Sequence, residues 1–162
     1  MPATHAPVGY ICPICLGVQQ IENDNTLIHT TDIVHRDELV TVLINSFFVG
    51  NNPGHAIVVP NSHVENIYTM PTEIGHRVFT VAQQVALALK VAYQCQGITL
   101  RQNNEPAGDQ HAFHFHLHVF PRYDNDGFNS VTPEQKQLAK PIERAKYARK
   151  LASALTIKTI VD

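Results

Sequence analysis

The chain has 162 residues, 44% of them hydrophobic and 16% charged, which is enough for one ordinary core and fits a single soluble domain. The formal net charge of −2 argues against a general nucleic-acid binder, and no apolar run approaches the length of a membrane span. Three cysteines, Cys12, Cys15 and Cys95, are too few for a disulfide scaffold, so we expect reduced thiols in a cytoplasmic protein. Histidine is unusually frequent, and four of its ten copies fall between residues 111 and 118.

The first half of the chain contains segments rich in β-forming residues, followed by a long helical pattern. The β-forming segments are Thr26–Ile33, Val40–Val49 and His55–Val59, and turn-forming residues separate them. They predict consecutive antiparallel strands. From Thr72 to about Tyr93, apolar residues recur every three or four positions, which predicts one long amphipathic helix packed on the sheet.

The second half returns to strands and ends in a helix. We expect a strand at Ile98–Arg101, turns over Asn103–Asp109 and a second strand at Gln110–Phe120. Residues Thr132–Gln135 have the pattern of a helix N-cap with proline in the first turn, and Pro141 should kink or split that helix. The order predicts an α+β fold in which an antiparallel sheet packs with a long helix and a C-terminal helix.

The strand expected at Gln110–Phe120 carries three of the histidines. Alternation places four apolar residues on one face and three histidines on the other: Phe113, Phe115, Leu117 and Val119 against His114, His116 and His118. Three imidazoles in a line cannot easily all bind one ion, so we expect them to divide their roles. The alternative is three surface histidines on the solvated face of an edge strand.

Two blocks of this sequence resemble the histidine triad (HIT) nucleotide hydrolases and transferases. One is His-Phe-His-Leu-His-Val-Phe at residues 114–120, and the other is Asn-Pro-Gly-His at residues 52–55. The resemblance covers about residues 10–122 and implies a HIT-like fold with a five-stranded antiparallel sheet, assembled as a homodimer. It implies a HIT domain over residues 1–125, with a zinc-binding segment at 10–19, and a helical extension over 126–162. The implied reaction is displacement at the α-phosphorus of a nucleotide.

The resemblance assigns roles to individual residues. A neutral imidazole attacks phosphorus well if its second nitrogen is held, since that fixes the tautomer. His116 matches the family nucleophile and would form a transient nucleotidyl-histidine. His118 would donate to the leaving group or hold a phosphate oxygen, and His55 would orient His116 or contact phosphate. Asn103 and Gln110 match positions that bind phosphate oxygens or the bridging atom.

Cys12 and Cys15 have the spacing of zinc ligands. One such pair alone is equally a redox pair or two ordinary thiols, because a zinc site needs about two further ligands. Some HIT proteins and the related galactose-1-phosphate uridylyltransferases complete the pair with histidines that match His63 and His114. The resemblance therefore implies a structural Cys2His2 zinc site that ties down the N-terminal segment.

Three residues depart from the family pattern. Phe47 stands eight residues before His55, where nucleotide-specific relatives carry Asp or Asn to bind the ribose. We expect Phe47 and Phe48 to form an apolar slot for a base. Glu105 replaces a frequent glycine and Asp109 stands where glycine is common, which puts negative charge beside a phosphate site.

Three classes of function follow from these features. The first is a hydrolase acting on nucleoside phosphoramidates, nucleotidyl esters or dinucleoside polyphosphates through His116. The second is a nucleotidyltransferase or phosphorylase with the same nucleophile. The third is a zinc-stabilised nucleotide-binding module with little turnover, which contacts a partner through residues 133–162, where seven of the twelve Lys and Arg residues lie. We expect a small nucleotide and a second copy as partners, and neither nucleic acid nor membrane.

Overall fold

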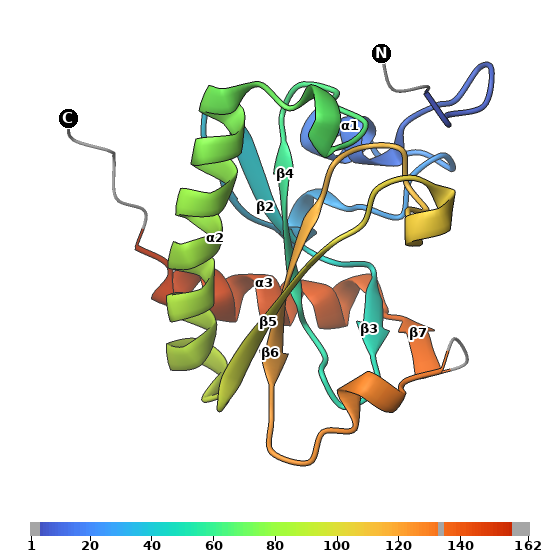
Figure 1. Ribbon diagram of the computed structural model, residues 1–162. Helices are drawn as coiled ribbons and strands as arrows, with labels where there is room; N and C mark the ends of the chain where they lie inside the picture. Colours follow the sequence, from blue (N-terminus) through green and yellow to red (C-terminus); the bar gives the residue numbers. More distant parts are fainter. Residues whose placement is uncertain (1–3, 133–134, 157–162) are drawn as a thin grey trace.

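The computed structural model describes residues 4–132 and 135–156, and its centre is a five-stranded sheet (Figure 1). The spatial order is β1 (Ile33–Arg36), β2 (Val40–Ile44), β4 (Ala56–Pro60), β6 (Leu117–Arg122) and β5 (Gly97–Gln102). Every neighbouring pair is antiparallel. A separate two-stranded sheet pairs β3 (Phe47–Val49) with β7 (Lys136–Leu138). The predicted α+β class and the five-stranded antiparallel sheet are confirmed.

Two helices pack against one face of the large sheet. The first, α2 (Thr72–Tyr93), has the predicted bounds, because its apolar residues follow a helical period and its buried stripe includes Val85 and Leu89. The second, α3 (Pro141–Ala154), packs against α2, β1 and β2. Val119 of β6 lies in the same fully buried core. Among the described residues, no helix has both the length and the apolar character of a membrane span.

The N-terminal segment covers the opposite face of the sheet. It contains α1 (Pro13–Val18), from which Ile14 and Val18 pack against Leu43 and Ile57 of the sheet. Successive residues of β4 therefore contact different layers, since Ile57 faces the N-terminal segment while its neighbours face the helices. Single turns of 3₁₀ helix connect several of these elements in the described part of the chain: η1 (Thr30–Asp32), η2 (Ile67–Thr69), η3 (Pro106–Gly108) and η4 (Phe128–Ser130).

Two strand predictions in the first half are wrong in their bounds. Residues 26–29 form irregular chain and η1 follows, because the buried Asp32 carboxylate accepts from His29 N at 2.9 Å and turns the backbone before β1. The segment predicted as one strand at Val40–Val49 is divided after β2. There the Asn45 side chain accepts from Phe47 N at 2.8 Å and redirects the chain into β3.

The predicted start of the C-terminal helix is also wrong. Part of the expected cap, residues 133–134, lies outside the described residues, and the chain that follows forms β7. Pro141 begins α3 instead of kinking it, because proline suits the first position of a helix. The buried Arg144 then fixes α3 by donating to Asp32 at 2.9 Å and to the Leu27 carbonyl at 2.8 Å. The domain boundary at residue 125 stays a prediction.

Candidate active site and metal centre

The histidine segment is only partly a strand. Residues 110–116 are irregular, and β6 begins at Leu117. Phe115 is buried in the core on the helix side, as alternation predicts, and His118 lies on the opposite face. His114 precedes β6, and its ring lies on the side of the sheet that the N-terminal segment covers. A tight turn, in which His114 N donates to the Ala112 carbonyl at 2.9 Å, directs its ring toward the cysteines of the N-terminal segment.

His116 is held by one of its two ring nitrogens. Its Nδ1 lies 2.7 Å from the carbonyl oxygen of His114. Because a carbonyl oxygen only accepts hydrogen bonds, Nδ1 must carry the proton and Nε2 must carry the lone pair. The tautomer that a nucleophilic imidazole requires is therefore set by the backbone two residues earlier.

His55 and His118 form a second pair of coupled rings. His55 Nε2 lies 3.2 Å from His118 Nδ1, and His55 Nδ1 is buried without a hydrogen-bond partner among the described residues. A proton on His55 Nδ1 would be an orphaned buried donor, so the favoured arrangement has His55 Nε2–H donating to His118 Nδ1. His118 then carries its proton on Nε2. Burial, together with the charges of His116 and Arg101, lowers the pKa of His55 to about 3 and that of His118 well below its ordinary value.

Packing fixes the orientation of both rings. Phe120 stacks on His55, with ring centroids 4.1 Å apart, and on His118, with centroids 5.4 Å apart. His55 follows Gly54, whose φ of +74° suits glycine, and any Cβ at that position would overlap the ring of Tyr147. We expected His55 to orient His116 or to contact phosphate, but the hydrogen bond it makes is to His118.

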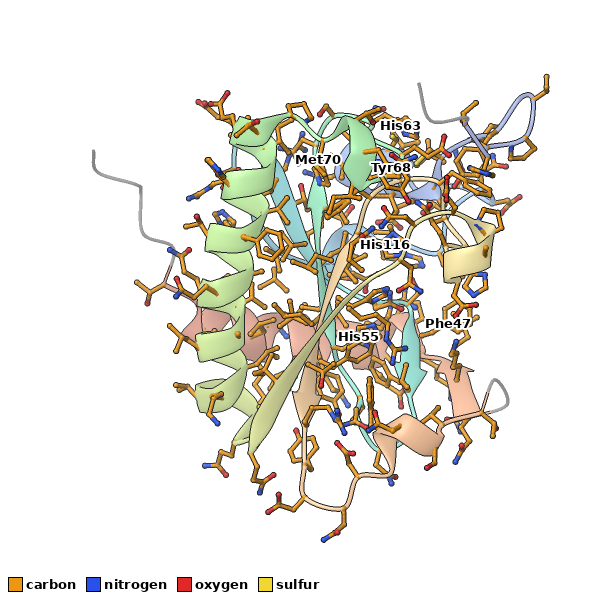
Figure 2. The ribbon with its side chains drawn as sticks, viewed as in Figure 1. Phe47, His55, His63, Tyr68, Met70 and His116 are labelled. Atoms are coloured by element: carbon orange, nitrogen blue, oxygen red, sulfur yellow. The ribbon has the colours of Figure 1, made fainter. Side chains whose placement is uncertain are left out.

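A cavity of about 170 Å³ includes His116 in its lining. Its lining is mostly apolar and comes from the N-terminal segment and the sheet: Pro13, Ile14, Leu27, Ile28, Leu43, Asn45, Ser46, Phe47, Ile57, Ala112 and His116. Figure 2 shows Phe47 on β3, to the right of His116 and His55. Phe47 lines the cavity, whereas Phe48 packs edge-to-face on Tyr147 on the helix side of the sheet.

Most cavity residues were not found from the sequence. Ile57 had a usable signal, because it lies two residues after His55 and so shares its face of β4. Leu27, Asn45 and Ser46 had none, since they reach the cavity through turns in segments that we expected to be continuous strands. Asn45 and Ser46 supply the polar side chains beside Phe47.

The two predicted phosphate ligands brace the loop before the histidines. Gln110 is buried, its Oε1 accepts from Glu105 N at 2.7 Å and its Nε2 donates to the Glu65 carbonyl at 2.6 Å. Asn103 Nδ2 donates to the Gly108 carbonyl at 2.5 Å. These contacts give both amides a structural role, and their contact with phosphate stays a prediction.

Glu105 is strained in this loop. Its φ of 64° and ψ of 160° suit glycine, the residue frequent at this position in the HIT family. Glu105→Gly should raise the free energy of unfolding by about 1 kcal/mol, because relief of strain exceeds the added entropy of the unfolded chain. Urea denaturation measures the change. Glu105→Ala removes the carboxylate but keeps the strain, so a gain of equal size in that variant would contradict the explanation.

The four predicted metal ligands come together at one end of the sheet. Cys12, Cys15, His63 and His114 place one ligand atom each within 4.8 Å of one another. Three sulfur–nitrogen distances are 3.4 Å: from His114 Nδ1 to each cysteine Sγ, and from His63 Nδ1 to Cys15 Sγ. Both cysteines are free thiols. Figure 2 shows His63 on the loop after β4, apart from His116.

This arrangement fits a tetrahedral zinc ion. Ordinary Zn–S and Zn–N bond lengths in a regular tetrahedron separate sulfur from nitrogen by about 3.6 Å, close to the observed spacing. His114 Nε2 lies 3.0 Å from the Pro60 carbonyl, which keeps the proton on Nε2 and leaves the Nδ1 lone pair facing the cysteines. Two thiols and two imidazoles are the donor set of structural zinc sites.

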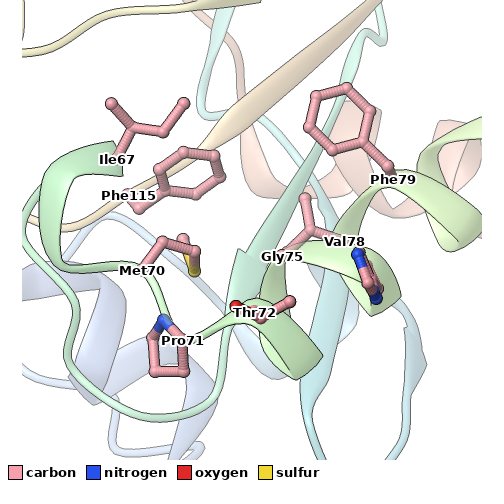
Figure 3. Close-up of a pocket in the computed structure, with 9 residues that line it drawn as sticks. Ile67, Met70, Pro71, Thr72, Gly75, Val78, Phe79 and Phe115 are labelled. Carbon is pink, nitrogen blue, oxygen red and sulfur yellow. The ribbon is translucent and has the colours of Figure 1, made fainter.

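A larger groove of about 420 Å³ lies at the start of α2 (Figure 3). Its lining is mostly apolar and includes Ile67, Met70, Phe79 and Phe115. Phe115 belongs to the helix-side core, so the groove lies on the other side of the chain from the cavity at His116. No nucleophile other than His76 and Thr72 lines this groove, and the candidate chemistry therefore belongs to the histidine site.

The comparisons with known proteins agree with this geometry. The HIT domain profile matches residues 28–125. Protein hit of Bacillus subtilis is 32% identical over 124 residues, which cover 75% of this chain and 83% of that protein. The crystal structure of a Hit-like protein from Bartonella henselae has a TM-score of 0.68 at 30% identity, covering 76% of this chain and 86% of that one.

A third relative has a lower identity. The Zn-bound histidine triad family protein from Mycobacterium smegmatis has a TM-score of 0.70 at 23% identity, covering 88% of this chain and 91% of that one, which shows a shared fold. The domain match spans more than half of the chain, and the Bacillus relative is matched over most of its length. The chain therefore belongs to the histidine triad (HIT) family, whose members bind nucleotides.

Proposed function

We propose that this protein hydrolyses nucleotidyl substrates through a nucleotidyl-histidine intermediate on His116. The observation that carries the proposal is the hydrogen bond from His116 Nδ1 to the His114 carbonyl, which leaves the Nε2 lone pair available. His116 lines a mostly apolar cavity and lies beside His118, with ring centroids 4.9 Å apart. Displacement at an α-phosphorus requires a nucleophile with a binding site for the nucleoside on one side and a hydrogen-bond donor for the leaving group on the other. His116 would be this nucleophile, with the cavity and His118 on its two sides.

The reaction has two steps. In the first, His116 Nε2 forms a bond to the α-phosphorus while the bond to the leaving group breaks, and the leaving group departs with the electron pair. The proton stays on His116 Nδ1, which keeps donating to the His114 carbonyl, and His118 Nε2–H donates a hydrogen bond to the negative oxygen of the leaving group. In the second step water attacks the same phosphorus, the P–N pair returns to Nε2, and the water proton passes to solvent.

The substrate is oriented by the cavity. The nucleoside occupies the space lined by Phe47 and Ile57, where apolar walls accept a base and the polar side chains of Asn45 and Ser46 lie within the same lining. The loss of Asp or Asn at position 47 makes Asn45 and Ser46 the candidates for contact with the ribose.

Cys12, Cys15, His63 and His114 would hold a structural zinc ion. A bound zinc ion would cross-link segments that are distant in sequence. It would take no part in the displacement, because protein ligands would fill all four of its coordination positions. The carbonyl that holds His116 belongs to His114, so the metal site and the nucleophile share one residue. The same segment supplies Pro13 and Ile14 to the cavity wall.

Product analysis separates the proposed function from its alternatives. The protein is incubated with a dinucleoside triphosphate, an adenosine phosphoramidate and the nitrophenyl ester of AMP, with and without inorganic phosphate. A hydrolase releases AMP under both conditions. A phosphorylase or transferase passes the AMP group to phosphate and so releases ADP in place of AMP when phosphate is present, and a binding module without turnover releases neither.

A second copy of the chain is the proposed partner at α2 and β5. Phe79, Leu87 and Val91 form an apolar stripe on α2 and are 56%, 64% and 72% exposed. Leu100, 47% exposed, lies on β5, which is an edge of the large sheet. We also propose a cytoplasmic location, consistent with the free thiols of all three cysteines.

Leu87→Glu should weaken this dimer by about 100-fold in dissociation constant, because it buries a charge among apolar side chains. Sedimentation velocity over a range of protein concentrations measures the change. Lys146→Glu, an exposed charge change on α3, should leave the dimer intact. A wild-type protein that is monomeric at high micromolar concentration, or a variant that dimerises normally, would contradict this interface.

A further inference from the structure

Arg101 lies next to His118 but has no role in the chemistry described so far. It occupies the position on β5 directly opposite His118 on β6, and opposed residues of an antiparallel pair share one face of the sheet. Its guanidinium carbon lies 5.7 Å from the ring centroid of Phe120 and 5.2 Å from that of Phe128. Phe120 is the ring that stacks on both His118 and His55, so Arg101 belongs to the same packed group.

No acid among the described residues neutralises the charge of Arg101. In the described part of the chain, Arg101 makes no hydrogen bond or ion pair with an acid, and its side chain is exposed. Its neighbour Arg122 differs, because it makes two bonds to Asp126 at 2.7 and 2.9 Å. The aromatic rings hold the guanidinium in place while its donors face solvent, which is the state of a group that is ready to bind an anion.

A second cation lies on the same side of the site. Lys136 of β7 pairs with Val49 of β3, and the side chain of Val49 packs against Phe120 and Phe128. The charges of Arg101 and Lys136 both lower the pKa of His118, which indicates that they act on the site face. Two positive charges near the neutral His118 ring create a local electrostatic potential that attracts an anion.

The relative positions of His116, His118 and Arg101 indicate which part of a bound substrate would meet the positive charge. His116 lines the cavity, whereas His118 and Arg101 do not; the ring centroid of His118 lies 4.9 Å from that of His116, and Arg101 lies opposite His118. A substrate with its base in the cavity and its α-phosphorus at His116 must extend its leaving group past His118. The leaving group then meets Arg101.

Resting on the proposed function, we infer that Arg101 binds a phosphate of the leaving group and makes the enzyme prefer substrates whose leaving group is itself a nucleotide or polyphosphate. Guanidinium pairs with phosphate through two parallel hydrogen bonds, a geometry that an amine or an aryl leaving group cannot match. His118 offers a hydrogen bond to the departing oxygen, and Arg101 offers the positive charge that stabilises a departing anion.

The test compares two substrates that differ only in their leaving group. Arg101→Ala should lower kcat/KM for a dinucleoside triphosphate by about 30-fold and change kcat/KM for the nitrophenyl ester of AMP by less than about twofold. Arg101→Lys should recover part of the loss, since it keeps the charge but not the paired donors. Arg149→Ala, on α3, is the matched control and should leave both substrates unaffected.

Binding gives an independent measurement. Calorimetric titration with inorganic tripolyphosphate should show at least about tenfold weaker binding in Arg101→Ala than in the wild type. Equal losses on both substrates, or no loss on either, would overturn the role of Arg101 while leaving the hydrolase intact. If the wild type cleaves neither substrate, the proposed function fails, and tripolyphosphate binding that does not depend on Arg101 then overturns the subsite as well.

Discussion

Replacing His116 by Asn should abolish turnover and leave the fold intact, with a fall in kcat of roughly 10⁴-fold or more. Asparagine retains an N–H that can donate to the His114 carbonyl, so the local geometry of the segment survives. It offers no lone-pair nitrogen to phosphorus, and the covalent step is lost. The effect should be on kcat, because the cavity that binds the nucleoside keeps its shape.

The control for this variant is His111→Asn. His111 is exposed and outside the paired rings, so its replacement should retain activity within about twofold, as is usual for surface changes. Thermal denaturation of both variants should match the wild type. Turnover at the wild-type rate in His116→Asn would refute the assignment of the nucleophile.

Replacing Cys12 by Ser should cost the protein its zinc and lower its Tm by roughly 10 °C. A ligand present at about a thousand times its dissociation constant stabilises a fold by about 4 kcal/mol, and each kcal/mol shifts Tm by about 2–4 °C at this chain length. The metal would join α1 to His63 after β4 and to His114 before β6. Its loss frees three segments that are distant in sequence.

Metal analysis of freshly purified protein measures the zinc content directly. The wild type should contain about one zinc ion per chain, as the four ligands require. Cys95→Ala is the control, because Cys95 is buried in the helix-side core away from the ligands and its loss should leave the zinc in place. Absence of zinc from the wild type, or a normal zinc content in Cys12→Ser, would contradict the site.

The helix α2 could be predicted to the residue, whereas the histidine strand could not. The period of α2 is set by burial along one side of a helix, a signal contained in the sequence. In the histidine segment, alternation continues for several residues before β6 begins, but the chain there forms a turn between Ala112 and His114 and does not pair as a strand. Whether an alternating segment pairs as a strand depends on its neighbours, and the sequence does not contain that information.

The metal ligands could be predicted from the sequence, whereas most of the cavity lining could not. The resemblance supplied His63 and His114 as partners of the cysteines, and the structure brings their ligand atoms together. The cavity lining depends on the turn at Asn45 and on the loop that Arg144 and Asp32 hold. The Arg144–Asp32 hydrogen bond joins residues 112 positions apart, so local patterns do not predict it.

The most direct test of the central claim is intact-mass analysis of the protein after rapid acid-free quenching with each candidate substrate. We expect a mass increase of one nucleotidyl group on the wild type, located on the peptide that contains His116 and lost on exposure to acid. His116→Asn should show no adduct. An adduct located on another residue, or turnover with no adduct at any quench time, would contradict covalent catalysis by His116.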